Sequence, residues 1–145
     1  MINKNINNYL PHRYPFLFVD KILCLKKYNY ILTIKNITIS EFYFTGHFPT
    51  KPIVPGIIII ESLAQTGGLL ANISLGIKVK YPNFYLGSIN NTKFKKIIVP
   101  GDQVYLEVRI KNIKKFAWKF TCQAFVDGKL VCYSDITCIR NYEKY

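Results

Sequence analysis

The sequence predicts an α+β domain in which an antiparallel β-sheet wraps around one long central α-helix. Three observations lead to this prediction. A single apolar run of helix length, from Pro55 to about Leu75, contains only one charged residue. Segments rich in β-branched and aromatic residues precede this run, and several more follow Pro82. Because only one helix candidate is available to cover the strands, we expect them to share it as a common core.

The N-terminal elements are expected to be a lead-in and a pair of strands. Tyr9–Asp20 is broken by Pro11 and Pro15, which predicts an ordered lead-in rather than a helix. Residues from about 21 to 40 alternate in part and are rich in Ile, Tyr and Thr. This pattern predicts two strands that turn near residues 27–29.

The helix is expected to begin at Pro55, because its fixed φ and missing N–H suit a first helical turn. The run is apolar on all faces, which predicts that other structure surrounds it. Gly67 and Gly68 each destabilise a helix by roughly 1 kcal/mol relative to alanine, so we expect a neighbouring backbone to approach closely there. The strands expected after the helix are 84–89, 104–110, 116–126 and 130–140, the last two joined by the hairpin turn Asp127–Gly128.

Length and composition indicate one soluble domain, 1–145, that is long enough to bury a core. Half of the residues are apolar and 15% are aromatic, which excludes a disordered chain. The run 53–71 approaches the length of a membrane span, but prolines, glycines and Glu61 interrupt it. A carboxylate at mid-span is unfavourable by about 2.5–3.5 kcal/mol. With no apolar signal segment near residue 1, we expect a cytoplasmic protein without a membrane span.

The four cysteines, Cys24, Cys122, Cys132 and Cys138, form no C-x-x-C pair, and no histidine follows them at metal-ligand spacing. We therefore expect reduced thiols and no metal site. The last three lie in apolar, strand-like runs, which suits small buried side chains.

The net charge of +12 has two explanations. An acidic partner is one, with Lys93, Lys95 and Lys96 as candidate contacts near a predicted loop. A biased coding composition is the other, since lysine, asparagine, isoleucine and tyrosine are all abundant. Nucleic acid is a weaker candidate, because the chain has only three arginines and no recognised binding motif.

The most informative segment carries His47 on a loop rich in proline and glycine and then enters the apolar run. Glu61 is the lone carboxylate of that run, and such a group is unfavourable in a core unless it is paired, hydrogen-bonded or protonated. Together they suggest an acid/base pair. Taken singly, His47 has the alternative of an ordinary surface or capping histidine, and Glu61 that of a buried salt-bridge partner.

Several blocks follow one another in a distinctive order: LPHRYPFL from Leu10, GHFP from Gly46, PIVPG from Pro52, ESLAQ from Glu61, FKK from Phe94, VPGD from Val99 and VDGK from Val126. With these blocks the chain resembles the β-hydroxyacyl-[acyl carrier protein] dehydratases, the hotdog-fold dehydratases of type II fatty acid synthesis. The resemblance extends from Tyr9 to Arg140.

The resemblance implies that His47 and Glu61 are the catalytic residues and that an acyl carrier protein delivers the substrate on its phosphopantetheine arm. It implies a homodimer, assembled as a trimer of dimers, in which each site takes His47 from one subunit and Glu61 from the other. It implies no metal or organic cofactor. Ser62 and Leu63 depart mildly from the usual Ala-Met, and glutamate rather than aspartate at position 61 favours the plain dehydratase over the dehydratase/isomerase branch.

In such a reaction His47 suits the base that removes the α-proton, and Glu61 suits the acid that helps hydroxide leave, provided that it holds a proton. The N–H of Gly56 is expected to stabilise the enolate oxygen, because amides in the first helical turn lack intrahelical acceptors. Glu61 lies roughly 7.5 Å further along the helix axis, which leaves room for a thioester carbonyl and a β-hydroxyl.

Three further side chains are expected to support the site. Gln65 is expected to position Glu61 or to pair across the dimer. Tyr85 resembles a family tyrosine that gates the acyl tunnel, and its alternative is a core aromatic. His12 is expected to order the lead-in by hydrogen bonding. The competing functions are a hotdog acyl thioesterase, a non-catalytic acyl-carrier-binding subunit and, more distantly, a basic nucleic-acid-binding protein.

Overall fold

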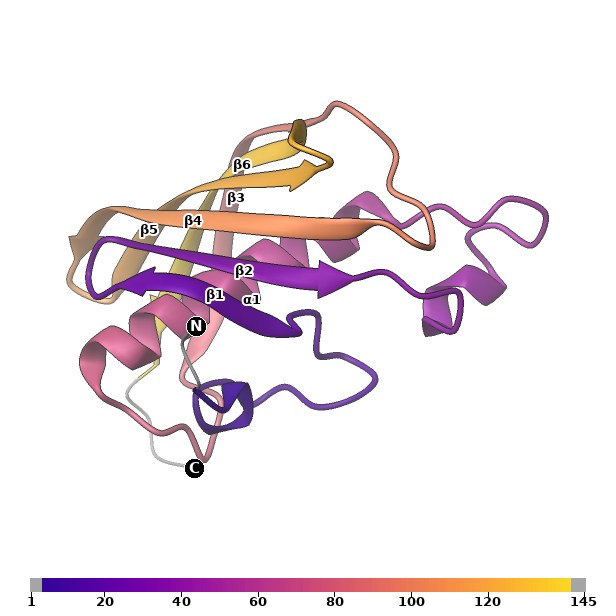
Figure 1. Ribbon diagram of the computed structural model, residues 1–145. Helices are drawn as coiled ribbons and strands as arrows, with labels where there is room; N and C mark the ends of the chain where they lie inside the picture. The colour runs from indigo at the N-terminus through magenta and orange to yellow at the C-terminus, as the bar shows by residue number, and fades with distance from the viewer. Residues whose placement is uncertain (1–3, 142–145) are drawn as a thin grey trace.

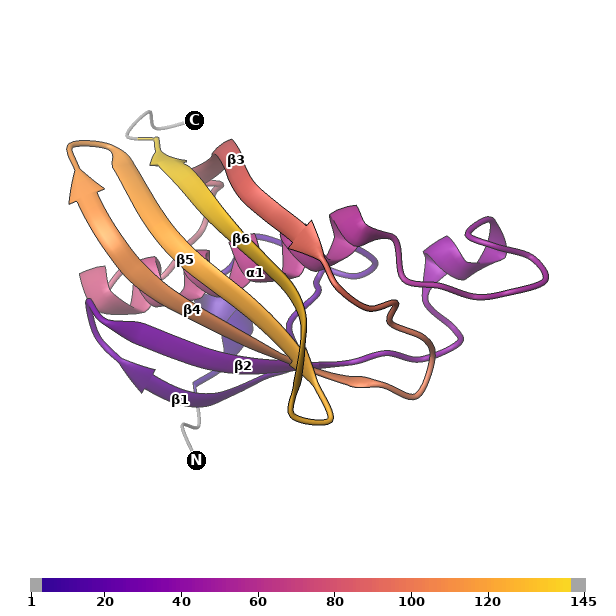
Figure 2. The same ribbon diagram turned by 90° about the horizontal axis from the view of Figure 1, so that it is seen from above.

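The computed structural model describes residues 4–141, which form one α-helix, two short 3-10 helices and one six-stranded antiparallel sheet (Figure 1). In chain order the elements are η1 (Ile6–Asn8), β1 (Lys21–Lys26), β2 (Tyr30–Asn36), η2 (Phe42–Thr45), α1 (Gly56–Leu75), β3 (Phe84–Phe94), β4 (Gln103–Lys114), β5 (Ala117–Val126) and β6 (Lys129–Arg140). The strand order is β1-β2-β4-β5-β6-β3, and α1 lies along one face of the sheet (Figure 2). The predicted α+β architecture is therefore confirmed.

β3 forms one edge of the sheet and is longer than expected, since it runs to Phe94 rather than to residue 89. It pairs with β6 in a register that extends from Phe84 opposite Arg140 to Phe94 opposite Cys132. Most of its side chains are exposed, so its second half carries no alternation of apolar and polar residues that would mark a strand. Neighbouring hydrogen bonds, rather than local pattern, define this part of the strand.

α1 is covered along its C-terminal half and partly open along its N-terminal half. The helix begins at Gly56, and Pro55 precedes it as the N-cap with an extended ψ of 135°. Every residue from 65 to 74 is buried, whereas Ile57 is 71% exposed and Glu61 and Ala64 are half-buried. The helix is long and apolar enough to cross a membrane, but most of it is buried in the fold, so it is the core helix.

Side chains, not a backbone, approach Gly67 and Gly68 of α1. A Cβ atom at Gly67 would lie 3.0 Å from the ring of Phe120, and one at Gly68 would lie 3.4 Å from Cδ2 of Leu10. The expectation of a close backbone is therefore wrong. Phe120 of the sheet and Leu10 of the lead-in instead pack against α1 where the two glycines have no side chain.

The segment between β2 and α1 extends beyond the end of the sheet in both views and carries η2 (Figures 1 and 2). Lys35, the penultimate residue of β2, anchors the start of this segment. Its Nζ lies 3.0 Å from Oε1 of Glu41 and 3.4 Å from Oδ2 of Asp20, and its side chain is only 10% exposed. The ion triad thus joins β2 to the lead-in and to the base of the extended segment.

Replacing Lys35 with methionine is expected to lower the free energy of unfolding by about 3 kcal/mol, because Glu41 would keep its buried charge without a partner. Urea unfolding at one fixed protein concentration measures the change. Lys21→Met provides the control, because Lys21 is exposed on β1, and its effect should stay within about 0.5 kcal/mol. Equal effects of the two substitutions would contradict a stabilising triad.

Candidate active site

His47 lies in the extended segment, directly after η2, and several backbone contacts fix its position. Its N–H donates to the Tyr43 carbonyl at 2.9 Å, and its carbonyl accepts from the Ile53 N–H at 3.1 Å. Nδ1 of its ring lies 2.7 Å from the Ile53 carbonyl oxygen. Because a carbonyl oxygen only accepts, Nδ1 carries the proton in this bond. The neutral ring therefore presents the lone pair of Nε2, as a general base requires.

His47 and Gly56 line one mainly apolar cavity of about 440 Å³. Gly56 is the first residue of α1, and among the described residues no acceptor receives its N–H. A Cβ atom at Gly56 would lie 2.8 Å from Cε1 of Phe94, so only glycine leaves this wall of the cavity undisturbed. Lys95 and Lys96 also line it. The cavity thus combines a base, a free amide donor at the positive end of a helix and two cations.

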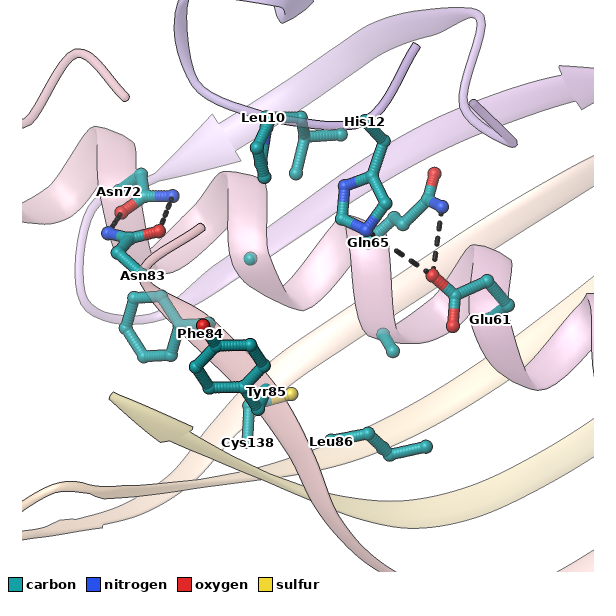
Figure 3. A pocket seen from close by; sticks show the side chains of 13 residues that line it. Leu10, His12, Glu61, Gln65, Asn72, Asn83, Phe84, Tyr85, Leu86 and Cys138 are labelled. Atoms are coloured by element: carbon teal, nitrogen blue, oxygen red, sulfur yellow. Dashed lines mark hydrogen bonds and ion pairs between the residues drawn. The ribbon is translucent and has the colours of Figure 1, made fainter. Parts of the chain in front are cut away.

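Glu61 borders a second, narrower cavity of about 60 Å³, which Gln65, Tyr85 and His12 also line (Figure 3). Its side chain is 22% exposed, so it is less buried than the surrounding apolar sequence suggested. It lies on the partly open face of α1. The structure places Glu61 at the surface of the isolated chain, beside a pocket, rather than within the closed core.

Both polar atoms of the Gln65 side-chain amide form hydrogen bonds, which connect Glu61 with the lead-in. Its Nε2 donates to Oε1 of Glu61 at 2.9 Å and to the Phe16 carbonyl at 3.0 Å, while its Oε1 accepts from the Phe18 N–H at 2.8 Å. The side chain is almost fully buried. These contacts favour a positioning role for Gln65 within the same chain.

The polar contact of the His12 side chain is with α1 rather than with other residues of the lead-in. Its Nε2 lies 3.5 Å from Oε1 of Glu61, and its buried Nδ1 has no hydrogen-bond partner among the described residues. Arg13 holds the lead-in instead, because its guanidinium donates to the carbonyl oxygens of Asn7, Leu10 and His12. Sequence reasoning missed the contact with Glu61 because 49 positions separate the two residues and no periodic pattern connects them.

Tyr85 lines the Glu61 cavity and is 44% exposed, so it is not a core aromatic in this chain. Lys93, Lys95 and Lys96 are exposed at the end of β3 and in the segment that follows it. Of these three, Lys95 and Lys96 border the His47 cavity.

The described residues that line the two cavities do not overlap, so the chain does not bring His47 to Glu61. Gly56 lies with His47, although it is on the same helix as Glu61. Each chain therefore has His47 and the Gly56 amide in one cavity and the Glu61 carboxyl group in the other. Within residues 4–141, no cluster of three or more His, Cys, Asp or Glu side chains could hold a metal ion.

Each cavity also contains a cysteine, but neither thiol is poised as a nucleophile. Cys132 borders the His47 cavity and Cys138 the Glu61 cavity. Burial raises the pKa of Cys132 to about 11, and burial together with the nearby Glu61 raises the pKa of Cys138 to about 12. All four cysteines are free, and the three expected to be buried are buried.

Iodoacetamide at about pH 8 is expected to leave Cys132 and Cys138 unmodified in the folded protein, because about one thiol in a thousand or fewer is then a thiolate. The partly exposed Cys24 serves as the internal comparison. Peptide mass mapping measures the labelling, and all four cysteines should react after unfolding in urea. Rapid labelling of Cys138 in the folded protein would contradict its assignment as an inert thiol.

Comparison with known proteins places these features in a family. Residues 10–135 match the family described as the FabA-like domain. The 3-hydroxyacyl-[acyl-carrier-protein] dehydratase FabZ of Coxiella burnetii (strain RSA 331 / Henzerling II) is 41% identical over 137 residues, which cover 94% of this chain and 96% of that protein. FabZ of Legionella pneumophila (strain Lens) is 45% identical over 128 residues, which cover 88% of this chain and 85% of that protein. FabZ of Actinobacillus pleuropneumoniae serotype 5b (strain L20) is 46% identical over 131 residues, covering 90% and 85%.

Solved structures share the fold at much lower identity. A chain of the dehydratase heterocomplex ApeI:P from Xenorhabdus doucetiae matches with a TM-score of 0.81 at 12% identity, covering 95% of this chain and 91% of that chain. A hypothetical thioesterase with coenzyme A from Streptococcus pneumoniae TIGR4 matches with a TM-score of 0.63 at 13% identity, covering 86% and 88%. These similarities establish the hotdog fold. They do not separate dehydratases from thioesterases, because both occur among the matches.

Proposed function

This chain belongs to the FabA-like family, and from that membership we propose that it is a hydro-lyase of fatty acid biosynthesis that dehydrates (3R)-3-hydroxyacyl-[acyl carrier protein] to the trans-2-enoyl product. The observation that carries the proposal is the 41–46% identity to 3-hydroxyacyl-[acyl-carrier-protein] dehydratases over most of the chain. His47 and Glu61 supply the two groups that such an elimination needs.

The base and the amide donor act from the His47 cavity. Nε2 of His47 removes the proton α to the thioester carbonyl, since the Ile53 carbonyl holds the ring with its proton on Nδ1. The Gly56 N–H donates to the carbonyl oxygen as it becomes an enolate. A donor of this kind contributes about 2.7–4 kcal/mol to transition-state stabilisation in other enzymes.

The acid acts from the Glu61 cavity. As the Cα–H bond breaks and the double bond forms, the C–O bond to the β-hydroxyl breaks, and the proton of Glu61 goes to the departing oxygen. Water and the trans-2-enoyl thioester are the products. His47 then holds the α-proton and Glu61 is a carboxylate, so proton exchange with solvent restores both groups.

A dimer would bring the two cavities together. The open face of α1 at Ile57, Glu61 and Ala64 supports a partner helix, and the exposed β3 edge supports pairing with the same strand of a second copy. The extended segment, which projects beyond the end of the sheet (Figure 1), places His47 in a cavity that Glu61 of the same chain does not line. In the proposed dimer, each site combines His47 and Gly56 of one subunit with Glu61 of the other. We further propose that three such dimers assemble into a hexamer in the cytoplasm.

The substrate is proposed to arrive on an acyl carrier protein through its phosphopantetheine arm. Lys95 and Lys96 border the His47 cavity, and Lys93 lies beside them on β3. These three exposed cations on and beside the cavity lining favour an acidic partner, chiefly by raising the association rate at low salt. The reaction itself requires no metal or organic cofactor.

Ultraviolet-monitored turnover of 3-hydroxyacyl-[acyl carrier protein] tests this function. The dehydratase is expected to form the trans-2-enoyl product without releasing free carrier thiol. Release of thiol would favour the thioesterase instead. Binding of the carrier without either product would favour a non-catalytic carrier-binding subunit.

A further inference from the structure

His12 and Gln65 contact the same oxygen of Glu61 from different elements (Figure 3). Gln65 Nε2 lies 2.9 Å from Oε1, and His12 Nε2 lies 3.5 Å from Oε1. Among the described residues no hydrogen bond reaches Oε2. The two carboxyl oxygens are therefore not equivalent, since the donors gather on one and leave the other open.

The surroundings of His12 favour the neutral ring with its proton on Nε2. Its Nδ1 is buried and has no partner among the described residues, so a proton there would be a buried donor without an acceptor. The pKa of His12 is lowered, mainly because the ring is buried and further by the charge of Arg13, while Glu61 acts in the opposite direction. Neutral His12 thus has its Nε2–H on the nitrogen that lies 3.5 Å from Glu61 Oε1, without bringing a positive charge.

The absence of a positive charge matters for the proposed acid. A cation beside a carboxyl group favours its ionised form, whereas the elimination needs Glu61 protonated at the start. A neutral donor orients the group with a smaller bias toward ionisation. In a protonated carboxyl group the carbonyl oxygen accepts hydrogen bonds and the hydroxyl oxygen carries the proton. Two neutral donors on Oε1 therefore select Oε1 as the carbonyl oxygen and Oε2 as the hydroxyl oxygen.

We propose that His12 is a positioning residue of the dehydration, which together with Gln65 holds Oε1 of Glu61 and so keeps the acidic proton on Oε2, toward the β-hydroxyl of the substrate. This role rests on the proposed function. The other titratable groups at this site are Cys138 on β6 and Tyr85 on β3. Arg13 donates to carbonyl groups of the lead-in and stabilises the loop that carries His12.

The kinetic test compares His12→Leu, which removes the donor, with His12→Gln, whose amide can replace Nε2–H. The leucine variant is expected to lose roughly 10- to 100-fold in kcat, as misplacement of a catalytic group does, with little change in KM. The glutamine variant is expected to recover most of that loss. A matching thermal transition for each variant verifies folding, and His12→Ala replaces the leucine variant if that protein does not fold.

A second readout does not depend on turnover. Because the chain has only four glutamates, labelling them with ¹³C at Cδ allows the Glu61 carboxyl signal to be assigned as the one that Glu61→Gln removes. Loss of a donor disfavours the charged carboxylate, so the Glu61 signal should titrate at higher pH in His12→Leu and near the wild-type pH in His12→Gln. A purely structural role of His12 would not produce this reversal.

The outcomes separate this role from the proposed function. An active wild-type enzyme whose kcat and Glu61 titration are both unchanged in His12→Leu would overturn the positioning role alone. A wild-type protein that forms no enoyl product would overturn the proposed function and the positioning role with it. A loss of kcat in His12→Leu that His12→Gln does not restore, with an unchanged Glu61 titration, would also overturn it.

Discussion

Replacement of His47 with asparagine is expected to lower the kcat of dehydration by about 10²- to 10⁴-fold, the usual contribution of a general base. Asparagine is the informative substitution because its amide N–H can still donate to the Ile53 carbonyl, which His47 Nδ1 does at 2.7 Å. The loop contact is thus kept while the basic nitrogen is removed. His47→Ala removes both, and the difference between the two variants measures the contribution of the loop contact.

Glu61→Gln is expected to cause a loss of the same order, about 10²- to 10⁴-fold, because an amide has no acidic proton to donate. The glutamine carbonyl can still accept from Gln65 Nε2, which lies 2.9 Å from Oε1 of Glu61, so the position of the side chain is preserved. Enoyl formation from a 3-hydroxyacyl thioester on the carrier protein measures all three variants. Full activity in folded His47→Asn or Glu61→Gln protein would remove that residue from the mechanism.

The sequence was sufficient to predict the elements that local pattern defines. The apolar run that became α1 and the alternating segments of β5 and β6 were predicted within a few residues of their observed ends. The second half of β3 was missed, because its side chains are exposed and only pairing with β6 makes it a strand. Tertiary hydrogen bonds, which no local pattern encodes, decide such edges.

The site was predictable in its residue types but not in its arrangement. A histidine in a proline-rich loop and a lone carboxylate in an apolar helix both indicated chemistry, and the family resemblance gave them roles. No residue pattern indicated that His47 and Glu61 lie apart within one chain; that expectation came from the family resemblance, and the two residues do line different cavities. The contact between His12 and Glu61 depends on where the lead-in crosses α1. This contact follows from long-range packing.

The fold alone does not select the reaction. A hypothetical thioesterase and a dehydratase complex both share the architecture of this chain at 12–13% identity. Function therefore depends on the groups placed on the scaffold. The proposed combination of an imidazole base, a helix amide that has no acceptor among the described residues and a carboxyl group held by neutral donors is suited to elimination, in which a proton leaves and a proton is delivered.

Mixing two inactive variants is expected to restore activity, and the recovered fraction has a defined value. If each site takes His47 from one subunit and Glu61 from the other, a dimer of one His47→Asn subunit and one Glu61→Gln subunit contains one site with both substitutions and one intact site. Random pairing makes half of the dimers mixed, so the preparation should recover about a quarter of the wild-type kcat. Each variant alone should stay near its own low value.

The measurement uses the two variants with different affinity tags, either co-expressed or unfolded and refolded together, and purified through both tags. In the proposed trimer of dimers, the two tags can come from different dimers of one hexamer, so the doubly tagged hexamers should again have about a quarter of the wild-type activity. Doubly tagged protein isolated as single dimers should have about half, since one of the two sites is intact. Variants that are simply mixed in the folded state should recover activity only as fast as subunits exchange. If the doubly tagged dimers were as inactive as the parents, His47 and Glu61 would have to act within one chain. The extended segment would then need to fold back onto α1, because in this structure it carries His47 to a cavity that Glu61 does not line.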